Sequence, residues 1–92
     1  MRTIWKFVLA FDPDDVHLHA PIVRFVGIDP ASGEIAVWIE HVADGAVDTY
    51  LRFIVKGTGI RLDDVPASAQ YIGSVIQWQT YVWHVYCTMQ AI

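Results

Sequence analysis

The stretch from Gln70 to Cys87 constrains the fold most, because it is aromatic or β-branched along nearly its whole length. It contains two of the four Trp and three of the four Tyr residues. Residues of these types favour strands. The stretch therefore predicts two strands joined by a tight turn near Gln77 to Thr80, a hairpin on which the other strands pack. Alternation along its second strand places Trp83 in the core, on the same face as Tyr81 and Val85.

Shorter apolar segments elsewhere in the chain alternate with polar residues, as half-buried strands do. They predict strands at Thr3 to Leu9, Val16 to Ala20, Ile22 to Ile28, Glu34 to Val42 and Thr49 to Lys56. Pro21 stops the second of these, which is expected at a sheet edge. No window of about 12 residues has a convincing helical period. The sequence predicts a single β domain over residues 1–92, a small antiparallel β-sandwich or partly open barrel of about six or seven short strands.

Charge and cysteine usage restrict the expected partners and the expected cellular compartment. The net charge is −4, and the six Lys and Arg residues are scattered, so nucleic acid is not expected as the main partner. The single Cys87 rules out an internal disulfide and fits a reducing compartment. Lys6 splits the first apolar run, which argues against a secretory signal. No apolar run reaches the roughly 20 residues that span a bilayer. We therefore expect a cytoplasmic protein with no membrane contact.

Short motifs along most of the chain resemble an uncharacterised family of small bacteriophage and prophage proteins. The motifs are Ile4-Trp5-Lys6-Phe7, Trp38 in mid-strand, Gly57-Thr58-Gly59, Tyr71-Ile72-Gly73-Ser74-Val75 and Val82-Trp83-His84-Val85-Tyr86. Members of that family open with a Trp-Lys-aromatic strand and end on Val-Trp-His-Val-aromatic. This chain departs from the pattern by continuing from Cys87 to Ile92. The resemblance implies the cytoplasm of an infected host cell, and it brings neither an activity nor catalytic residues.

A binding face is predicted on the side of the strands opposite the core. Its members are large or cationic residues at outward positions: Trp38, Tyr50, Arg52 and Ile54. Arg beside large aromatics is typical of protein interfaces. The leading hypothesis is therefore a non-enzymatic protein that occupies a host or phage protein, for counter-defence or host take-over. Arg and aromatic rings also stack on bases, so the alternative is a protein that sequesters a small nucleotide-like signal between protomers.

Histidines give a third hypothesis, a His-dependent metalloenzyme. His17 and His19 share one side of an extended segment, as two metal ligands on a strand do. His41 or His84 could be a third ligand, and the aspartates between Asp12 and Asp15 could add a carboxylate. Without Cys partners or a helix carrying more ligands, neither a metal nor another cofactor is expected. His84 has no evident nucleophile and orienting partner in the sequence, so an enzyme is not expected either.

Several strands carry bulky residues on both faces, which suggests self-association. Ile4 and Val8 oppose Trp5 and Phe7, and Trp38 lies opposite its core-facing neighbours in the same way. One domain of this length cannot cover both faces with its own short loops. We therefore expect a homo-oligomer, with a two-fold dimer as the favoured state.

Overall fold

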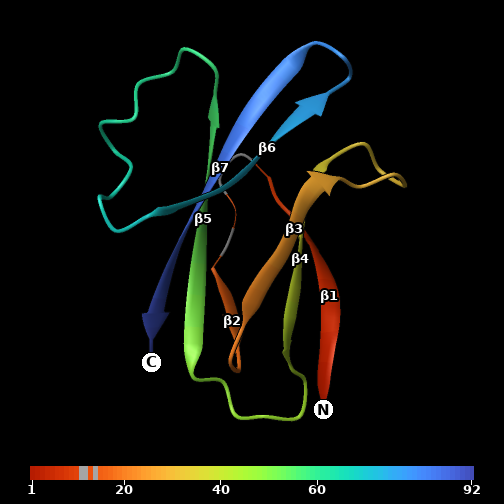
Figure 1. Ribbon diagram of the computed structural model, residues 1–92, viewed down its shortest axis with the longest axis vertical. Coiled ribbons are helices and arrows are strands. Elements are labelled where there is room, and N and C mark those ends of the chain that lie inside the picture. The colour runs from red at the N-terminus through yellow and green to blue at the C-terminus, as the bar shows by residue number, and fades with distance from the viewer. Residues whose placement is uncertain (11–12, 14) are drawn as a thin grey trace.

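Two antiparallel sheets make up the fold of the computed structural model, which describes residues 1–10, 13 and 15–92. Sheet A has the strand order β1-β4-β3, and sheet B has the order β2-β5-β7-β6 (Figure 1). The strands are β1 (Arg2–Val8), β2 (Val16–Leu18), β3 (Ile22–Ile28), β4 (Ile35–Val42), β5 (Thr49–Gly57), β6 (Gln70–Gln77) and β7 (Tyr81–Ala91). The predicted all-β class is confirmed as a small sandwich that does not close into a barrel.

The core lies between the two sheets and is centred on β4, β5 and β7. The largest fully buried side chains are Ile39, Leu51, His41, Val37 and Val85. The buried positions follow the alternation predicted from the sequence. In β5, for example, Leu51, Phe53 and Val55 point inward. Trp83 packs against this core but is only half-buried. The prediction that Trp83 lies in the core is therefore met only in part, because its ring lies at the edge of the core and not at its centre.

The β3–β4 hairpin is closed by the predicted turn at residues 29–33. The Gly33 amide donates to the Asp29 carbonyl at 2.8 Å, and Gly33 has a φ of 74°, which glycine adopts without strain. The buried Asp29 carboxylate accepts hydrogen bonds from the Ser32 hydroxyl and the Ala31 amide. These bonds, with the ammonium group of Lys6, lower the pKa of Asp29 and hold the turn in one geometry.

The β6–β7 hairpin forms where the sequence predicted it. Its turn is closed by the Thr80 amide, which donates to the Gln77 carbonyl at 3.1 Å. Trp78 and Gln79, at the centre of the turn, have φ values of 52° and 58°. Gln77 pairs with Tyr81, so the loop has three residues, and two of them have a positive φ that Gly and Asn adopt more readily than Trp or Gln.

The sheets approach each other most closely where β3 meets β6. A Cβ added to Gly73 would lie only 3.3 Å from the Cβ of Val26. Gly73 also lies at a register shift of β6 against β7, next to Tyr71. A glycine at this bulge therefore lets the edge strand of one sheet pack against the edge strand of the other.

The predicted short edge strand is β2, which pairs with β5 at the edge of sheet B. Residues 58–69 form no strand, as expected for that irregular stretch. The last strand is longer than predicted and continues to Ala91. Among the residues that the structure describes, no helix is long and apolar enough to cross a membrane.

Candidate functional site

The predicted binding face is divided between the two sides of the sandwich. Trp38 lies on β4 in sheet A, and the other three residues lie on β5 in sheet B. Neighbours on each strand point into the shared core, so the predicted residues point away from it in opposite directions. The structure brings together Tyr50, Arg52 and Ile54, and separates all three from Trp38.

The outer face of sheet A is the side of β1, β4 and β3 that points away from the core. Its exposed apolar residues are Ile4, Val8, Ile22 and Phe25, with the half-buried Trp38 among them. Phe25 is 60% exposed and Ile4 is 52% exposed. The Phe25 and Trp38 rings have their centroids 5.4 Å apart, so they form one aromatic surface.

Charged residues surround this apolar centre. Arg2 Nε lies 2.5 Å from Glu40 Oε2, and Arg24 lies 3.0 Å from Glu40 Oε1. Hydrogen bonds from Arg2 and then Arg24 lower the pKa of Glu40, so the carboxylate stays charged. Lys6 lies 3.1 Å from the buried Asp29. The outer face of sheet A thus combines exposed aromatics with two arginines that point toward a shared carboxylate.

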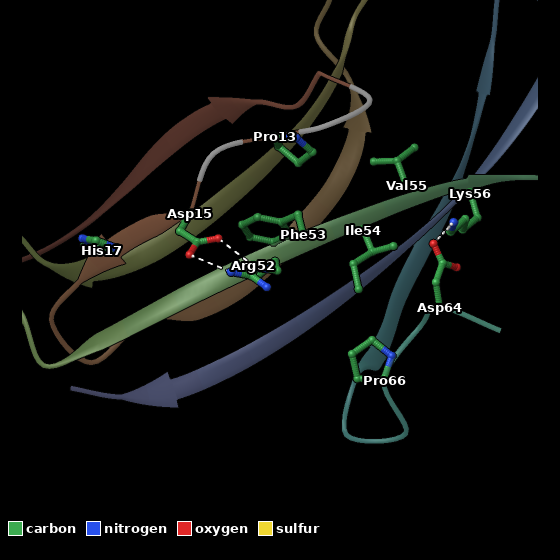
Figure 2. A pocket seen from close by; sticks show the side chains of 10 residues that line it. All are labelled: Pro13, Asp15, His17, Arg52, Phe53, Ile54, Val55, Lys56, Asp64 and Pro66. Atoms are coloured by element: carbon green, nitrogen blue, oxygen red, sulfur yellow. Dashed lines mark hydrogen bonds and ion pairs between the residues drawn. The ribbon is translucent and has the colours of Figure 1, made fainter. Parts of the chain in front are cut away.

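Sheet B borders an open groove of about 760 Å³, which is lined by β5 residues from both the outer and the core-facing side of the strand. Figure 2 shows β5 along its floor, with Asp15 and His17 on one side and Asp64 and Pro66 on the other. Arg52 Nε lies 3.1 Å from Asp15 Oδ1, and Lys56 Nζ lies 2.8 Å from Asp64 Oδ2. Hydrogen bonds from the two cations lower the pKa of these aspartates.

This pairing limits what the groove can bind. Each cation in it already has a carboxylate partner, so an anionic ligand would have to displace Asp15 or Asp64. The nearby His17 and Tyr50 rings meet edge to face, with centroids 5.9 Å apart. The groove therefore offers aromatic surface and balanced charge rather than an open anion site.

A chain of hydroxyl groups around His84 was missed in the sequence analysis. Ser74 Oγ lies 2.7 Å from His84 Nδ1, and Thr58 Oγ1 lies 2.8 Å from His84 Nε2. The Tyr71 hydroxyl continues the chain at 2.5 Å from Ser74 Oγ. The predicted turn at residues 77–80 was the nearest signal, but a two-residue loop there would place Ser74 opposite Trp83. The structure has a three-residue loop, with Gln77 opposite Tyr81, and this places Ser74 opposite His84. A serine next to an imidazole is half of a nucleophile pair, but the group on the far nitrogen is a hydroxyl rather than a carboxylate.

The two histidines suggested as metal ligands have separate partners. His17 lies on β2 beside Tyr50, whereas His19 lies after the strand and binds Asp48 and the Ala46 carbonyl. Asp12 and Asp14 fall outside the described residues. Within residues 1–10, 13 and 15–92, no three His, Cys, Asp or Glu side chains are grouped closely enough to hold a metal ion.

The chain belongs to an uncharacterised family, the domain of unknown function DUF7352, whose match covers residues 1–91. No curated protein matches the chain. No solved structure matches it either. The family match and the resemblance found in the sequence agree on one point, that the chain is an uncharacterised domain.

Proposed function

We propose that this member of the DUF7352 family is a non-enzymatic protein that binds another protein through the outer face of sheet A. The observation that carries the proposal is the group of exposed apolar side chains on this face, with Phe25 60% exposed. Contiguous exposed apolar surface on a small soluble domain marks an interaction site. Aromatic and Arg side chains together, as in Phe25, Trp38 and Arg24, are enriched at such sites.

The charges on this face favour a partner with carboxylates around an apolar centre. Arg2, Lys6 and Arg24 lie on it, while Glu40 is its outward-pointing carboxylate and Asp29 is buried. The chain as a whole has a net charge of −4, so this local excess of cations is distinctive. An acidic rim on the partner would pair with the arginines and speed association.

The test compares two matched substitutions on opposite faces. Phe25→Asp places a charge on the outer face of sheet A, and Ile54→Asp places the same charge on the outer face of sheet B. Affinity capture from a bacterial lysate should recover a stoichiometric protein with wild type and Ile54→Asp, but not with Phe25→Asp. Loss with Ile54→Asp alone would move the binding site to the groove of sheet B.

Cross-linking identifies the chemistry of the contact. The two lysines lie on different faces, Lys6 on sheet A and Lys56 on sheet B. A carbodiimide joins an amine directly to a carboxylate, so it should link Lys6 to an acidic residue of the captured protein. Links from Lys56 alone, or a partner without carboxylates at the contact, would contradict the proposed acidic rim.

A second copy of the chain is the other candidate for this face. The presence of both positive and negative side chains on this face favours a dimer, because a two-fold axis could exchange the arginine partners of Glu40 between protomers. Sedimentation at micromolar concentration tests it with Trp38→Glu and Ile54→Glu. Since these two residues lie on opposite faces, only Trp38→Glu should split a dimer formed by sheet A. A monomer mass for wild type would exclude the dimer.

The absence of catalysis is part of the proposal and has its own test. The two nitrogens of His84 contact the hydroxyl groups of Thr58 and Ser74, and among the described residues no carboxylate forms an ion pair with this imidazole. Ser74 Oγ is also engaged by the Tyr71 hydroxyl. A fluorophosphonate should therefore leave Ser74 unmodified. Rapid labelling of Ser74 that is abolished in His84→Ala would establish an active nucleophile instead.

The setting that we propose is the cytoplasm of a bacterium infected by a phage or carrying a prophage. The support is the Trp-Lys-aromatic opening and the Val-Trp-His-Val-aromatic segment. The single Cys87, buried and unpaired, fits a reducing compartment. In this setting the bound protein would belong to the host or the phage, with a role in counter-defence or host take-over. Fractionation of infected cells should recover the protein with the cytoplasm, and recovery with the envelope would contradict this.

A further inference from the structure

Two hairpin turns meet at the end of the molecule away from both termini and enclose a pocket of about 530 Å³. They are the β3–β4 turn and the β6–β7 turn (Figure 1). The side chains that matter here are Glu34, Gln77, Trp78, Tyr81 and Trp83, which all line the pocket. This rim pocket is separate from the outer face of sheet A and from the groove of sheet B.

Gln77 ties the two turns together. Its side chain is buried, and its Nε2 donates to the Gly33 carbonyl at 2.9 Å. Its Oε1 accepts a hydrogen bond from Trp83 Nε1, also at 2.9 Å. A buried amide with both ends engaged holds its neighbours in fixed positions. The walls of the rim pocket are therefore preorganised rather than assembled when a ligand arrives.

Trp78 is held at the mouth of the pocket by a strained backbone. It is 69% exposed, and it lies in a turn where neither it nor Gln79 is a residue that suits positive φ. Its ring lies against the β3–β4 turn, since a Cβ on Gly33 would lie 3.4 Å from Trp78 Nε1, at van der Waals contact. Strain of this kind at an exposed position points to a function for the side chain, since folding alone would favour Asn or Gly.

The aromatic rings form a corner. The Trp78 and Tyr81 centroids are 6.2 Å apart, with their planes at 78°. Tyr81 in turn stacks on Trp83 at 6.0 Å and 27°. In a T-shaped pair the edge of one ring points at the other ring, so a group placed against the pair can meet a ring face, and ring faces carry negative potential.

The formal charge in the pocket is negative, like the potential of the ring faces. Glu34 is the charged side chain among the described residues that line it, and no described residue forms an ion pair with Glu34. The remaining lining includes Leu9 and Ile35, which are apolar. Ring faces and a carboxylate together attract a cation, and the apolar lining suits one that carries alkyl groups instead of a hydration shell.

We infer that the rim pocket binds an organic cation, an alkylated ammonium group seated against Trp78 and Tyr81 with Glu34 as its counter-ion. A saccharide would also stack on these rings, but both ends of the Gln77 amide are already used, and Leu9 and Ile35 make part of the remaining lining apolar. An anion is disfavoured by Glu34. The site is independent of the protein partner proposed for sheet A.

The test uses choline and its neutral isostere 3,3-dimethylbutan-1-ol, in which carbon replaces the charged nitrogen. The four Trp residues give separate indole N–H signals in a nitrogen–proton correlation spectrum. Choline should shift the signals of Trp78 and Trp83 and leave those of Trp5 and Trp38 unchanged. The neutral alcohol should bind about tenfold more weakly, the difference expected of a cation over aromatic faces.

Variants separate the two parts of the site. Trp78→Ala should abolish the choline shifts, and Glu34→Gln should weaken choline severalfold without changing the response to the alcohol. Phe25→Ala, on the outer face of sheet A, is the control that should leave binding intact. Equal affinity for choline and the alcohol would overturn the assignment of a cation. Shifts with glucose but not choline would make this a saccharide site, and no shift with any ligand to about 50 mM would refute a binding pocket.

Discussion

Gln79→Gly should stabilise the protein by relieving the strained β6–β7 turn. Gln79 has a φ of 58°, in the left-handed region, which costs a residue with a side chain about 1–2 kcal/mol. Glycine removes that cost but adds about 0.5–1 kcal/mol of conformational entropy to the unfolded chain. The net gain is about 0.5–1 kcal/mol, which for a chain of this size raises the melting temperature by about 2–6 °C.

The control for this change is Gln79→Ala, which keeps the Cβ and therefore the strain. Thermal unfolding followed by circular dichroism should rank Gln79→Gly above wild type, with Gln79→Ala at or below it. If the glycine variant unfolds at the same temperature as the alanine variant, the turn is not strained. A more mobile Trp78 in the glycine variant should also weaken choline binding, which would connect the strain to the proposed site.

Other predictions concern the core. Leu51→Ala should lower the free energy of unfolding by about 2–5 kcal/mol, at least as much as Trp83→Ala, because Leu51 is fully buried and Trp83 lies at the rim; urea denaturation gives the ranking, and a larger loss for Trp83→Ala would place that ring at the centre. His41→Leu should be neutral or stabilising, because its buried Nε2 has no hydrogen-bond partner among the described residues; a clear loss of stability would show that Nε2 has a partner. Burial raises the pKa of the Cys87 thiol from 9.0 to about 11; the folded state holds this proton more tightly, so stability should fall as pH rises from about 9 to about 11. Native Cys87 should also react with a thiol reagent only on unfolding, and fast reaction at pH 8 would contradict its burial.

The strands could be predicted because each depends on local alternation. The pattern of β5 gave its inward and outward residues correctly, and the turn at residues 77–80 was recognisable from the two strands around it. That turn predicts that the two strands pair, but not their register, because the loop has three residues and shifts the partner of Ser74 from Trp83 to His84. The contact of His84 with Thr58 could not be reached in this way, because it requires β5 to lie beside β7.

The grouping of the predicted binding residues on one face was wrong because alternation says which residues point outward but not which sheet they belong to. β4 and β5 follow each other in sequence, which suggests that they are neighbours. The connection between them instead crosses from sheet A to sheet B, so Trp38 and Arg52 end on opposite sides. The rim pocket was beyond reach for a similar reason, since Gln77 and Gly33 meet only after the two sheets have packed.

Two surfaces of the protein carry charge that the fold leaves without a full set of partners, and the groove of sheet B does not. In the groove of sheet B, Arg52 and Lys56 are each neutralised by an aspartate of the same chain, so a ligand gains little there beyond what it must displace. On the outer face of sheet A, two arginines share Glu40, which leaves positive charge for a partner. At the rim, Glu34 has no described cation beside it, which leaves negative charge next to exposed rings. Recognition uses charges that the fold has not already paired, and in this protein those charges have opposite signs at two separate places. A protein with an acidic rim and a small organic cation can therefore bind the same molecule without competing for the same groups.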